Sequence, residues 1–342
     1  MLTDKESANA EDNDLRLQQI KLWIESDLKI SSFQIDTASA DASFRRYFRV
    51  STKDVHGSSF IIMDAPPDKE DCRPFINIAR LIESAGVHAP YIYEFNQAQG
   101  FMRLSDLGST AYLDKLTEDT ADELYLAAIQ AIVKMQTISS DLPAYDAALL
   151  HTEMSLFKDW YLNKHLAVAL DNKQNEILTN TFSILVENAL QQTSVFVHRD
   201  YHSRNLMITN ENNPGVIDFQ DAVTGPLSYD LVSLIKDCYI SWPRNKQLEW
   251  IELYIKFSPL EIDKERFIKQ VDLMGMQRHL KAIGIFARLN YRDAKPNYMH
   301  DIPRTLAYVF DVCERYAELS DFSQLLSALN IQADEALLSR IK

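Results

Sequence analysis

One stretch in the second half of the chain, residues 197–220, constrains the fold more than any other. It reads V-H-R-D-Y-H-S-R-N-L-M-I-T-N-E-N-N-P-G-V-I-D-F-Q. Apolar runs end at residue 197 and occupy 206–208 and 216–217, and polar or turn-forming residues separate them. Short apolar runs between turn signals are typical of buried strands. The stretch therefore predicts strands whose ends carry Asp200, Asn205 and Asp218.

These three side chains have the chemistry of a phosphoryl-transfer site. Oxygen ligands such as Asn205 and Asp218 suit Mg²⁺, which keeps several waters and bridges phosphates. Asp200 can then orient a hydroxyl nucleophile and accept its proton. The alternative is that these residues only form Asx turns, which are common in loops. The order H-x-D-x-x-x-x-N, strand, turn and I-D-F favours the catalytic interpretation.

At these residues the chain resembles the superfamily of aminoglycoside phosphotransferases and choline kinases, which has the protein-kinase fold. H-R-D-Y-H-S-R-N at 198–205 is similar to the catalytic loop of that family, and I-D-F at 217–219 is similar to its metal-binding segment. The resemblance implies that ATP and Mg²⁺ are the cofactors, that Asp200 is the catalytic base, and that Asn205 and Asp218 hold the metal. It also implies that Asp230, in G-P-L-S-Y-D-L, opens a helix and braces the catalytic loop.

A strand-rich N-terminal part followed by helices predicts an α+β fold of two lobes. We expect a protein-kinase-like architecture, with a small β-rich nucleotide-binding lobe at residues 1–104. The larger helical lobe at 105–342 would carry the catalytic loop and the acceptor site. Apolar residues at helical spacing predict the first helix at 15–26, and the acidic, polar residues 1–14 are expected to form a loose tail.

The segment D-A-S-F-R-R-Y-F-R-V, residues 41–50, predicts a hairpin turn that runs into a strand. The resemblance implies that this loop covers the nucleotide, although it contains no glycine, and that backbone groups near residue 105 bind adenine. The strand at 59–64 departs from the family because Met63 and Asp64 stand where a Lys or Arg is usual. We expect Arg45 or Arg46 to replace that cation; the alternative is that these arginines simply face solvent. The expected nucleotide-binding residues are Ser43, Phe44, Arg45, Arg46, Ser105 and Asp106.

The acceptor is suggested by further segments, including M-D-A-P-P and the helix 275–293, which resemble the branch of anomeric amino-sugar kinases of bacterial cell-wall recycling. That resemblance implies ATP-dependent phosphorylation of the C1 hydroxyl of N-acetylmuramate and N-acetylglucosamine. A carboxylate on the acceptor calls for arginine, whose planar fork binds it with two hydrogen bonds. Other acceptors of the superfamily (an aminoglycoside, choline or an amino-acid hydroxyl) and a pseudokinase that only binds ligands are the alternatives. The candidate acceptor residues are Arg204, Arg278, Arg288 and Arg292.

The overall charge limits the partners. The chain has 342 residues and a formal net charge of −14, which argues against nucleic acid and anionic membranes as partners. Its 3 cysteines show no metal-ligand spacing, and an odd number gives no disulfide framework. We find no N-terminal apolar targeting segment. The sequence thus predicts a cytoplasmic, monomeric enzyme with a small-molecule amino-sugar substrate.

Overall fold

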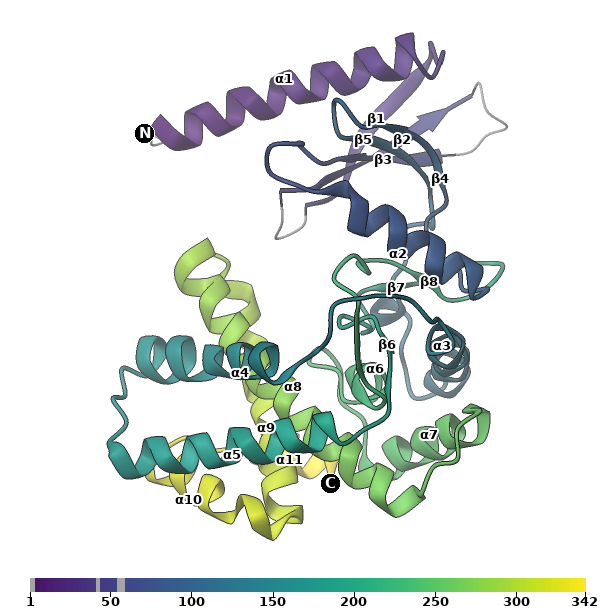
Figure 1. Ribbon diagram of the computed structural model, residues 1–342. Helices are drawn as coiled ribbons and strands as arrows, with labels where there is room; N and C mark the ends of the chain where they lie inside the picture. Colours follow the sequence, from purple (N-terminus) through teal and green to yellow (C-terminus); the bar gives the residue numbers. More distant parts are fainter. Residues whose placement is uncertain (1–3, 41–43, 54–58) are drawn as a thin grey trace. The chain divides into compact units, whose positions relative to one another are not determined.

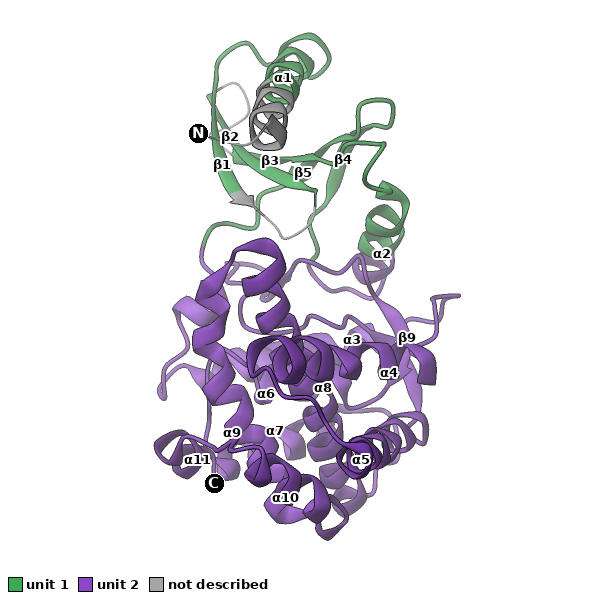
Figure 2. Ribbon diagram, turned by 90° about the vertical axis from the view of Figure 1, so that its left-hand side faces the viewer, with its two compact units in different colours: residues 1–80, 89–109 green, residues 81–88, 110–342 purple. Residues whose placement is uncertain are grey.

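A computed structural model of the chain describes residues 4–40, 44–53 and 59–342 (Figure 1). The chain forms two compact units (Figure 2). Unit 1 consists of residues 1–80 and 89–109, and unit 2 consists of residues 81–88 and 110–342. Unit 1 is built on an antiparallel sheet, whereas unit 2 is mainly helical. This arrangement confirms the predicted α+β, kinase-like fold class.

The sheet of unit 1 has the strand order β1-β2-β3-β5-β4, with antiparallel neighbours throughout. Gly100, at φ +72°, closes the β4–β5 turn, where an added Cβ would lie 1.9 Å from the carbonyl oxygen of Ala65. The strands are β1 (Phe33–Ala40), β2 (Arg46–Thr52), β3 (Ser59–Asp64), β4 (Ile92–Asn96) and β5 (Phe101–Ser105), and helix α2 (Cys72–Ser84) follows β3.

Helix α1 (Asp4–Ser26) covers one face of this sheet, as Figure 1 shows. Ile20, Trp23 and Ile24 of the helix pack with apolar side chains of β2, β3 and β5. The expectation of a loose tail at residues 1–14 was wrong from Asp4 onward, because the helix already begins there. Apolar periodicity cannot detect such a start, since the residues before Leu15 are polar but include good helix formers such as alanine, glutamate and lysine.

Strand alternation separates the side chains of β2 into two sets. Phe48 and Val50 contact α1, and we call this side of the sheet the α1 face. Arg46 is on the same face as Phe48 and Val50, because successive side chains of a strand point to opposite faces. Its partner in the ladder is Asp64. Tyr47 and its neighbour Met63 in the ladder therefore lie on the opposite face.

Unit 2 is organised around the long helix α8, which packs against most of the other helices of the unit. Gly284 of α8 lies so close to the junction of α4 with a π-helical segment that an added Cβ would be 2.3 Å from the carbonyl carbon of Leu156. The helices are α3 (Ala121–Met135), α4 (Ala147–Leu156), the π-helical Phe157–His165, α5 (Asn172–Leu190), α6 (Tyr229–Ile235), α7 (Arg244–Phe257), α8 (Lys264–Asp293), α9 (Ile302–Arg315), α10 (Ser320–Ala328) and α11 (Glu335–Ile341).

Two short antiparallel strand pairs lie within or directly beside residues 197–220. β6 (Ser194–Val197) pairs with β9 (Val223–Pro226), and β7 (Leu206–Met207) pairs with β8 (Gly215–Val216). The predicted strand–loop–strand–turn–strand order is confirmed; β9 was not predicted. Within the described part of the chain, no helix is long and apolar enough to cross a membrane.

Candidate active site

The backbone of the predicted catalytic loop, residues 198–205, is fixed at its start by one buried carboxylate. Asp230, in the first turn of α6, accepts hydrogen bonds from the backbone N–H groups of His198 at 2.7 Å and Arg199 at 3.1 Å. Arg199 has φ +76°, a left-handed conformation that a non-glycine residue adopts only at a cost. Burial raises the pKa of Asp230 to about 7. The expectation that Asp230 braces this loop is confirmed.

The second half of the loop is fixed by another buried carboxylate, that of Asp237. It accepts a hydrogen bond from the backbone N–H of Ser203 at 2.9 Å and another from the hydroxyl of the same residue. Its other oxygen accepts the backbone N–H of Tyr239 at 3.0 Å. Asp237 was not predicted as a site residue, although an acid at the end of the mainly apolar segment after Asp230 was a possible signal.

Asp200, Asn205 and Asp218 are brought together, as predicted. The side-chain amide of Asn205 donates to the main-chain carbonyl oxygen of Asp200 at 3.0 Å and to the side-chain carboxylate of Asp218 at 3.2 Å. Gln220 donates to the other oxygen of Asp218 at 2.9 Å. Asp218 itself has φ +64°, so the chain turns sharply where its carboxylate is presented.

A buried imidazole joins the two halves of this arrangement. His198 Nδ1 accepts the backbone N–H of Asp200 at 3.2 Å, while Nε2 lies 3.1 Å from the carbonyl oxygen of Ile217. These partners assign the proton to Nε2, because a carbonyl oxygen only accepts. Burial lowers the pKa of His198 to about 4, so the neutral ring is maintained. His198 therefore acts as a spacer between the catalytic loop and the segment that carries Asp218.

The charge of Asp200 is favoured by its surroundings. Burial by itself raises the pKa of this carboxyl group, but nearby positive charge, that of Lys281 first and also that of Arg278, outweighs burial and lowers the pKa. Lys281, on α8, lies 2.9 Å from the carboxylate of Glu153 on α4. Asp200 is thus an ionised carboxylate at neutral pH and can accept a proton.

Glu153 also binds the side chain of Arg199, so it joins α4 and α8 to the catalytic loop. The hydroxyl of Tyr145 donates to the same carboxylate. Burial raises the pKa of Glu153, but the charges of Lys281 and Arg199 outweigh burial and keep the pKa below its ordinary value. Sequence reasoning missed this group, since its members lie far apart along the chain.

The family follows from comparison with known proteins. The model of the phosphotransferase enzyme family matches residues 34–263. The chain belongs to this family. A relative from Pseudomonas putida, named N-acetylmuramate/N-acetylglucosamine kinase, is 42% identical over 94% of this chain and 99% of its own length. A relative of the same name from Pseudomonas aeruginosa is 44% identical over 93% of this chain and 98% of its own length.

Solved structures agree with the fold. An ADP-bound aminoglycoside phosphotransferase superposes with a TM-score of 0.57, at 14% identity, over 86% of this chain and 98% of its own. A choline/ethanolamine kinase family protein from Mesorhizobium loti gives a TM-score of 0.62, at 14% identity, over 93% of this chain and 100% of its own. The catalytic loop of this phosphotransferase is therefore carried on the expected kinase-like fold.

Asn205 and Asp218 have the ligand chemistry that a magnesium ion requires. The amide nitrogen of Asn205 is engaged by Asp200 and Asp218, which leaves its carbonyl oxygen as the ligand atom. Among the described residues, no three His, Cys, Asp or Glu side chains are grouped so that they could hold a metal ion. A pair of oxygen ligands nevertheless fits Mg²⁺, which completes its shell with water and phosphate oxygens.

The structure separates the predicted nucleotide-binding arginines of this phosphotransferase. Arg46 lies on the α1 face, where it and Arg16 of α1 both bind the buried carboxylate of Asp64; the Nε–oxygen distances are 3.0 Å and 2.8 Å. Arg45 instead pairs with Glu70, just before α2, at 3.1 Å. Arg46 thus anchors α1 to the sheet, whereas Arg45 belongs to the opposite face.

The remaining predicted nucleotide-binding residues are placed as follows. Phe44 has an exposed ring and donates its backbone N–H to Glu70 at 3.1 Å. The hydroxyl of Ser105 accepts the backbone N–H of Tyr91 at 2.8 Å. Asp106 pairs with Arg49 at 2.7 Å, so its side chain anchors β2. Ser43 lies outside the described residues.

The four candidate acceptor arginines of the helical unit differ in their surroundings. Arg278 is buried and lies 3.6 Å from the sulfur of Cys238. Arg288 is half-buried, and burial lowers its pKa. Arg292 is exposed and pairs with its neighbour Asp293 at 2.8 Å. The fourth, Arg204, is exposed on the catalytic loop.

Proposed function

We propose that this phosphotransferase is an ATP-dependent kinase that phosphorylates the C1 hydroxyl of N-acetylmuramate and N-acetylglucosamine. The observation that carries the proposal is the convergence of Asp200, Asn205 and Asp218 in one hydrogen-bonded group. Full-length relatives with this name support the choice of acceptor. We further propose that the enzyme is a monomer and works in the cytoplasm, where ATP is available.

The reaction can be assigned to residues of the chain. The acceptor oxygen attacks the γ-phosphorus, the bond from that phosphorus to the bridging oxygen of ADP breaks, and Asp200 accepts the hydroxyl proton. Because the transition state is loose, Asp200 mainly holds the hydroxyl in line and takes its proton late. Asn205 and Asp218 would hold Mg²⁺, which neutralises phosphate charge when it is bound.

Arg45 is the residue that we assign to the phosphates of ATP in place of the missing strand lysine. It lies beside Tyr47 on the face of the sheet opposite α1, and Glu70 fixes its guanidinium. Exchange of Arg45 for glutamine should raise the KM for ATP about tenfold, because one charge-assisted contact is lost. The KM for sugar should change little. R46Q should lower the melting temperature instead. Equal, small effects of both changes on the KM for ATP would contradict this assignment.

A panel of acceptors tests the proposed activity. ADP release should occur with N-acetylmuramate and with N-acetylglucosamine, and not with choline or kanamycin. Phosphorus NMR of the product should show coupling of the phosphate to the anomeric proton. Turnover with choline or kanamycin alone would identify a different acceptor class. Absence of turnover with every acceptor, despite ATP binding, would favour a pseudokinase.

Asp200→Asn tests the catalytic base. Asparagine keeps the shape and a hydrogen-bond acceptor but cannot take the proton. We expect kcat to fall by about 10²–10⁴-fold, with the KM for sugar nearly unchanged. Asp141→Asn, an exposed site in unit 2, is the matched control. Near-normal kcat for Asp200→Asn, in an assay limited by chemistry, would show that Asp200 is not the base.

A further inference from the structure

Arg204 occupies an unusual position on the catalytic loop. It lies between Ser203 and Asn205, and its guanidinium carbon is 3.6 Å from the centre of the ring of Tyr239. Arg204 is exposed, and its charge has no ion-pair partner among the residues that the structure describes. In a chain with a net charge of −14, such a cation beside the proposed metal ligands is a site for an anion.

The ring beneath Arg204 is fixed by the same carboxylate that fixes the loop. Asp237 accepts the backbone N–H of Ser203 on one oxygen and that of Tyr239 on the other, at 2.9 Å and 3.0 Å. The loop residue next to Arg204 and the aromatic ring under it are therefore held in a constant relation. A cation over an aromatic face keeps its hydrogen-bond donors available at the edge of the guanidinium plane.

A row of aromatic rings continues from Tyr239. His202 meets it edge-on at 5.3 Å between ring centres, and the ring centre of Phe286 lies 6.3 Å from that of Tyr239. Tyr298 stacks on Phe286 at 5.8 Å. Phe286 is only 4% exposed, so the row is packing beneath the loop and not a free surface. It holds the Tyr239 ring in place under Arg204.

Two of the other three candidate arginines are less suited to bind an anion from solution. Arg278 is buried, and Arg292 is already paired with Asp293. Arg204 is closest in sequence to the base, Asp200, and it is exposed on the same loop. The chemical difference between the two proposed acceptors is one negative charge, the lactyl carboxylate of N-acetylmuramate.

We infer that Arg204, held over Tyr239, binds the carboxylate of N-acetylmuramate and makes the enzyme favour this anionic sugar over neutral N-acetylglucosamine. The inference rests on the proposed function. A guanidinium binds a carboxylate with two parallel hydrogen bonds, and a charged hydrogen bond contributes about 1.5–3 kcal/mol, which corresponds to roughly 10–150-fold in affinity.

Steady-state kinetics with both sugars, at one saturating ATP concentration, test this inference. For R204Q, the ratio of kcat/KM for N-acetylmuramate to that for N-acetylglucosamine should fall by about 10–100-fold, as expected for one charge-assisted contact. R204K should keep part of the preference, because it retains the charge without the fork. R266Q, which neutralises an exposed arginine at the start of α8, is the control and should leave the ratio unchanged.

Calorimetric titration of the nucleotide-bound protein with N-acetylmuramate gives a second measurement that does not depend on turnover. R204Q should bind N-acetylmuramate more weakly than the wild type and should melt at nearly the same temperature. A ratio of kcat/KM that stays constant would overturn the inference. So would a separate titration with ATP that shows a selective rise in the KM for ATP, which would assign Arg204 to a different contact. Absence of wild-type turnover with either sugar would instead overturn the proposed function.

Discussion

Two buried carboxylates of the helical unit, Glu153 and Asp272, are surrounded by the same kinds of groups. Each binds one lysine and one arginine and accepts a hydrogen bond from one tyrosine hydroxyl. At Glu153 the partners are Lys281, at 2.9 Å, together with Arg199 and Tyr145. Because Arg199 belongs to the loop 198–205, this cluster attaches the helices to the segment that carries Asp200, the proposed base.

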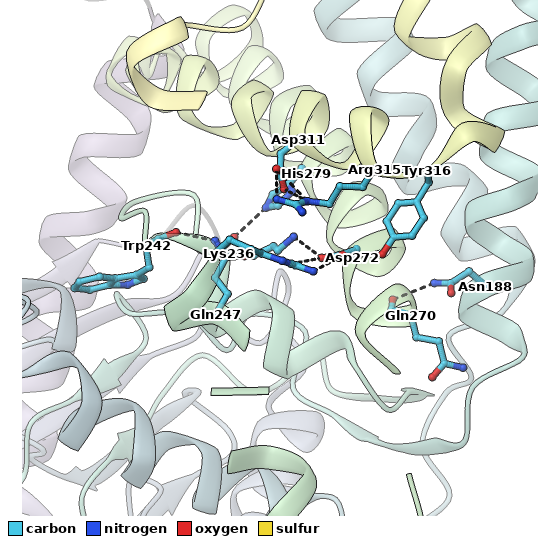
Figure 3. Close-up of polar contacts among 11 residues, drawn as sticks. Asn188, Lys236, Trp242, Gln247, Gln270, Asp272, His279, Asp311, Arg315 and Tyr316 are labelled. Carbon is cyan, nitrogen blue, oxygen red and sulfur yellow. Dashed lines mark hydrogen bonds and ion pairs between the residues drawn. The ribbon is translucent and has the colours of Figure 1, made fainter. Parts of the chain in front are cut away.

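The cluster at Asp272 attaches helices to one another (Figure 3). Asp272 lies on α8 and binds Lys236, at the end of α6, and Arg244, at the start of α7, both at 2.7 Å. The hydroxyl of Tyr316, just after α9, lies 2.8 Å from the same carboxylate. None of these residues belongs to the catalytic loop.

The two clusters also differ in their access to water. At Asp272, the carboxylate and Lys236 are 0% exposed and Arg244 is 10% exposed. At Glu153, the carboxylate is 7% exposed, and Lys281 and Arg199 are 11% and 18% exposed. Water can therefore compensate a broken contact less at Asp272 than at Glu153. Two buried ionic clusters of similar composition can therefore have different roles. The role depends on which helices or loops carry the cations.

The largest expected effect is on stability, at Asp272. Asp272→Asn leaves Lys236 and Arg244 buried without their counter-charge, and breaking a buried pair in this way costs about 3–5 kcal/mol. Chemical denaturation should show this loss in the free energy of unfolding, while the folded variant keeps a near-normal KM for both substrates. A loss below about 1 kcal/mol, the value typical of an exposed ion pair, would contradict the structural role.

Glu153→Gln should mainly affect catalysis. Without the carboxylate charge, the side chain of Arg199 loses its ion-pair partner, and Asp200 next to it is held less firmly. We expect kcat to fall by about 10–100-fold, because small displacements of a catalytic group reduce the rate strongly. The loss of stability should be smaller than for Asp272→Asn, and the KM values should change little.

Glu153→Asp is the matched control for that experiment, since it restores the charge with a shorter side chain. It should recover part of kcat, which a purely steric defect would not do. If Glu153→Gln lowered the free energy of unfolding as much as Asp272→Asn and left kcat intact, the proposed difference between the clusters would be wrong.

Acid titration sharpens the comparison. Burial raises the pKa of Asp272, but Lys236 and Arg244 outweigh burial and lower it to about 2. Because this folded pKa lies below the unfolded value of about 3.9, the stabilising contribution is complete above about pH 4 and is lost as the pH falls toward 2. Between pH 4 and pH 2.5 the wild type should lose about 1–2 kcal/mol more than Asp272→Asn. Parallel curves for the two proteins would contradict the assignment.

The sequence predicted those parts of the molecule that depend on local patterns. Strand β3 has the predicted bounds, Ser59–Asp64, and the loop with Asp200 and Asn205 lies between short strands as expected. Alternation along β2 could also have shown that Arg46 shares a face with Phe48 and Val50, but it was not applied to this arginine.

The ionic clusters could not be predicted in the same way. Glu153 and Lys281 lie on different helices, and a charged residue on a helix usually faces solvent. Their burial depends on how α4 packs against α8, where Gly284 permits close approach of the helices. Tertiary contacts of this kind leave no periodic signal in the sequence, so the residues packed around Asp200 were missed, whereas Asp200 itself was named as the candidate base.

The smallest expected effects concern the two tyrosines, and they test the comparison without altering any charge. Tyr316→Phe and Tyr145→Phe each remove one hydroxyl that donates to a buried carboxylate, at a cost of about 1–2 kcal/mol. If the clusters differ as argued, Tyr316→Phe should reduce only the free energy of unfolding. Tyr145→Phe should also reduce kcat a few-fold, because Glu153 then holds Arg199 less firmly. Denaturation curves and single-turnover rates of both variants measure these effects. An equal kcat for the two variants would show that the cluster at Glu153 does not position Asp200.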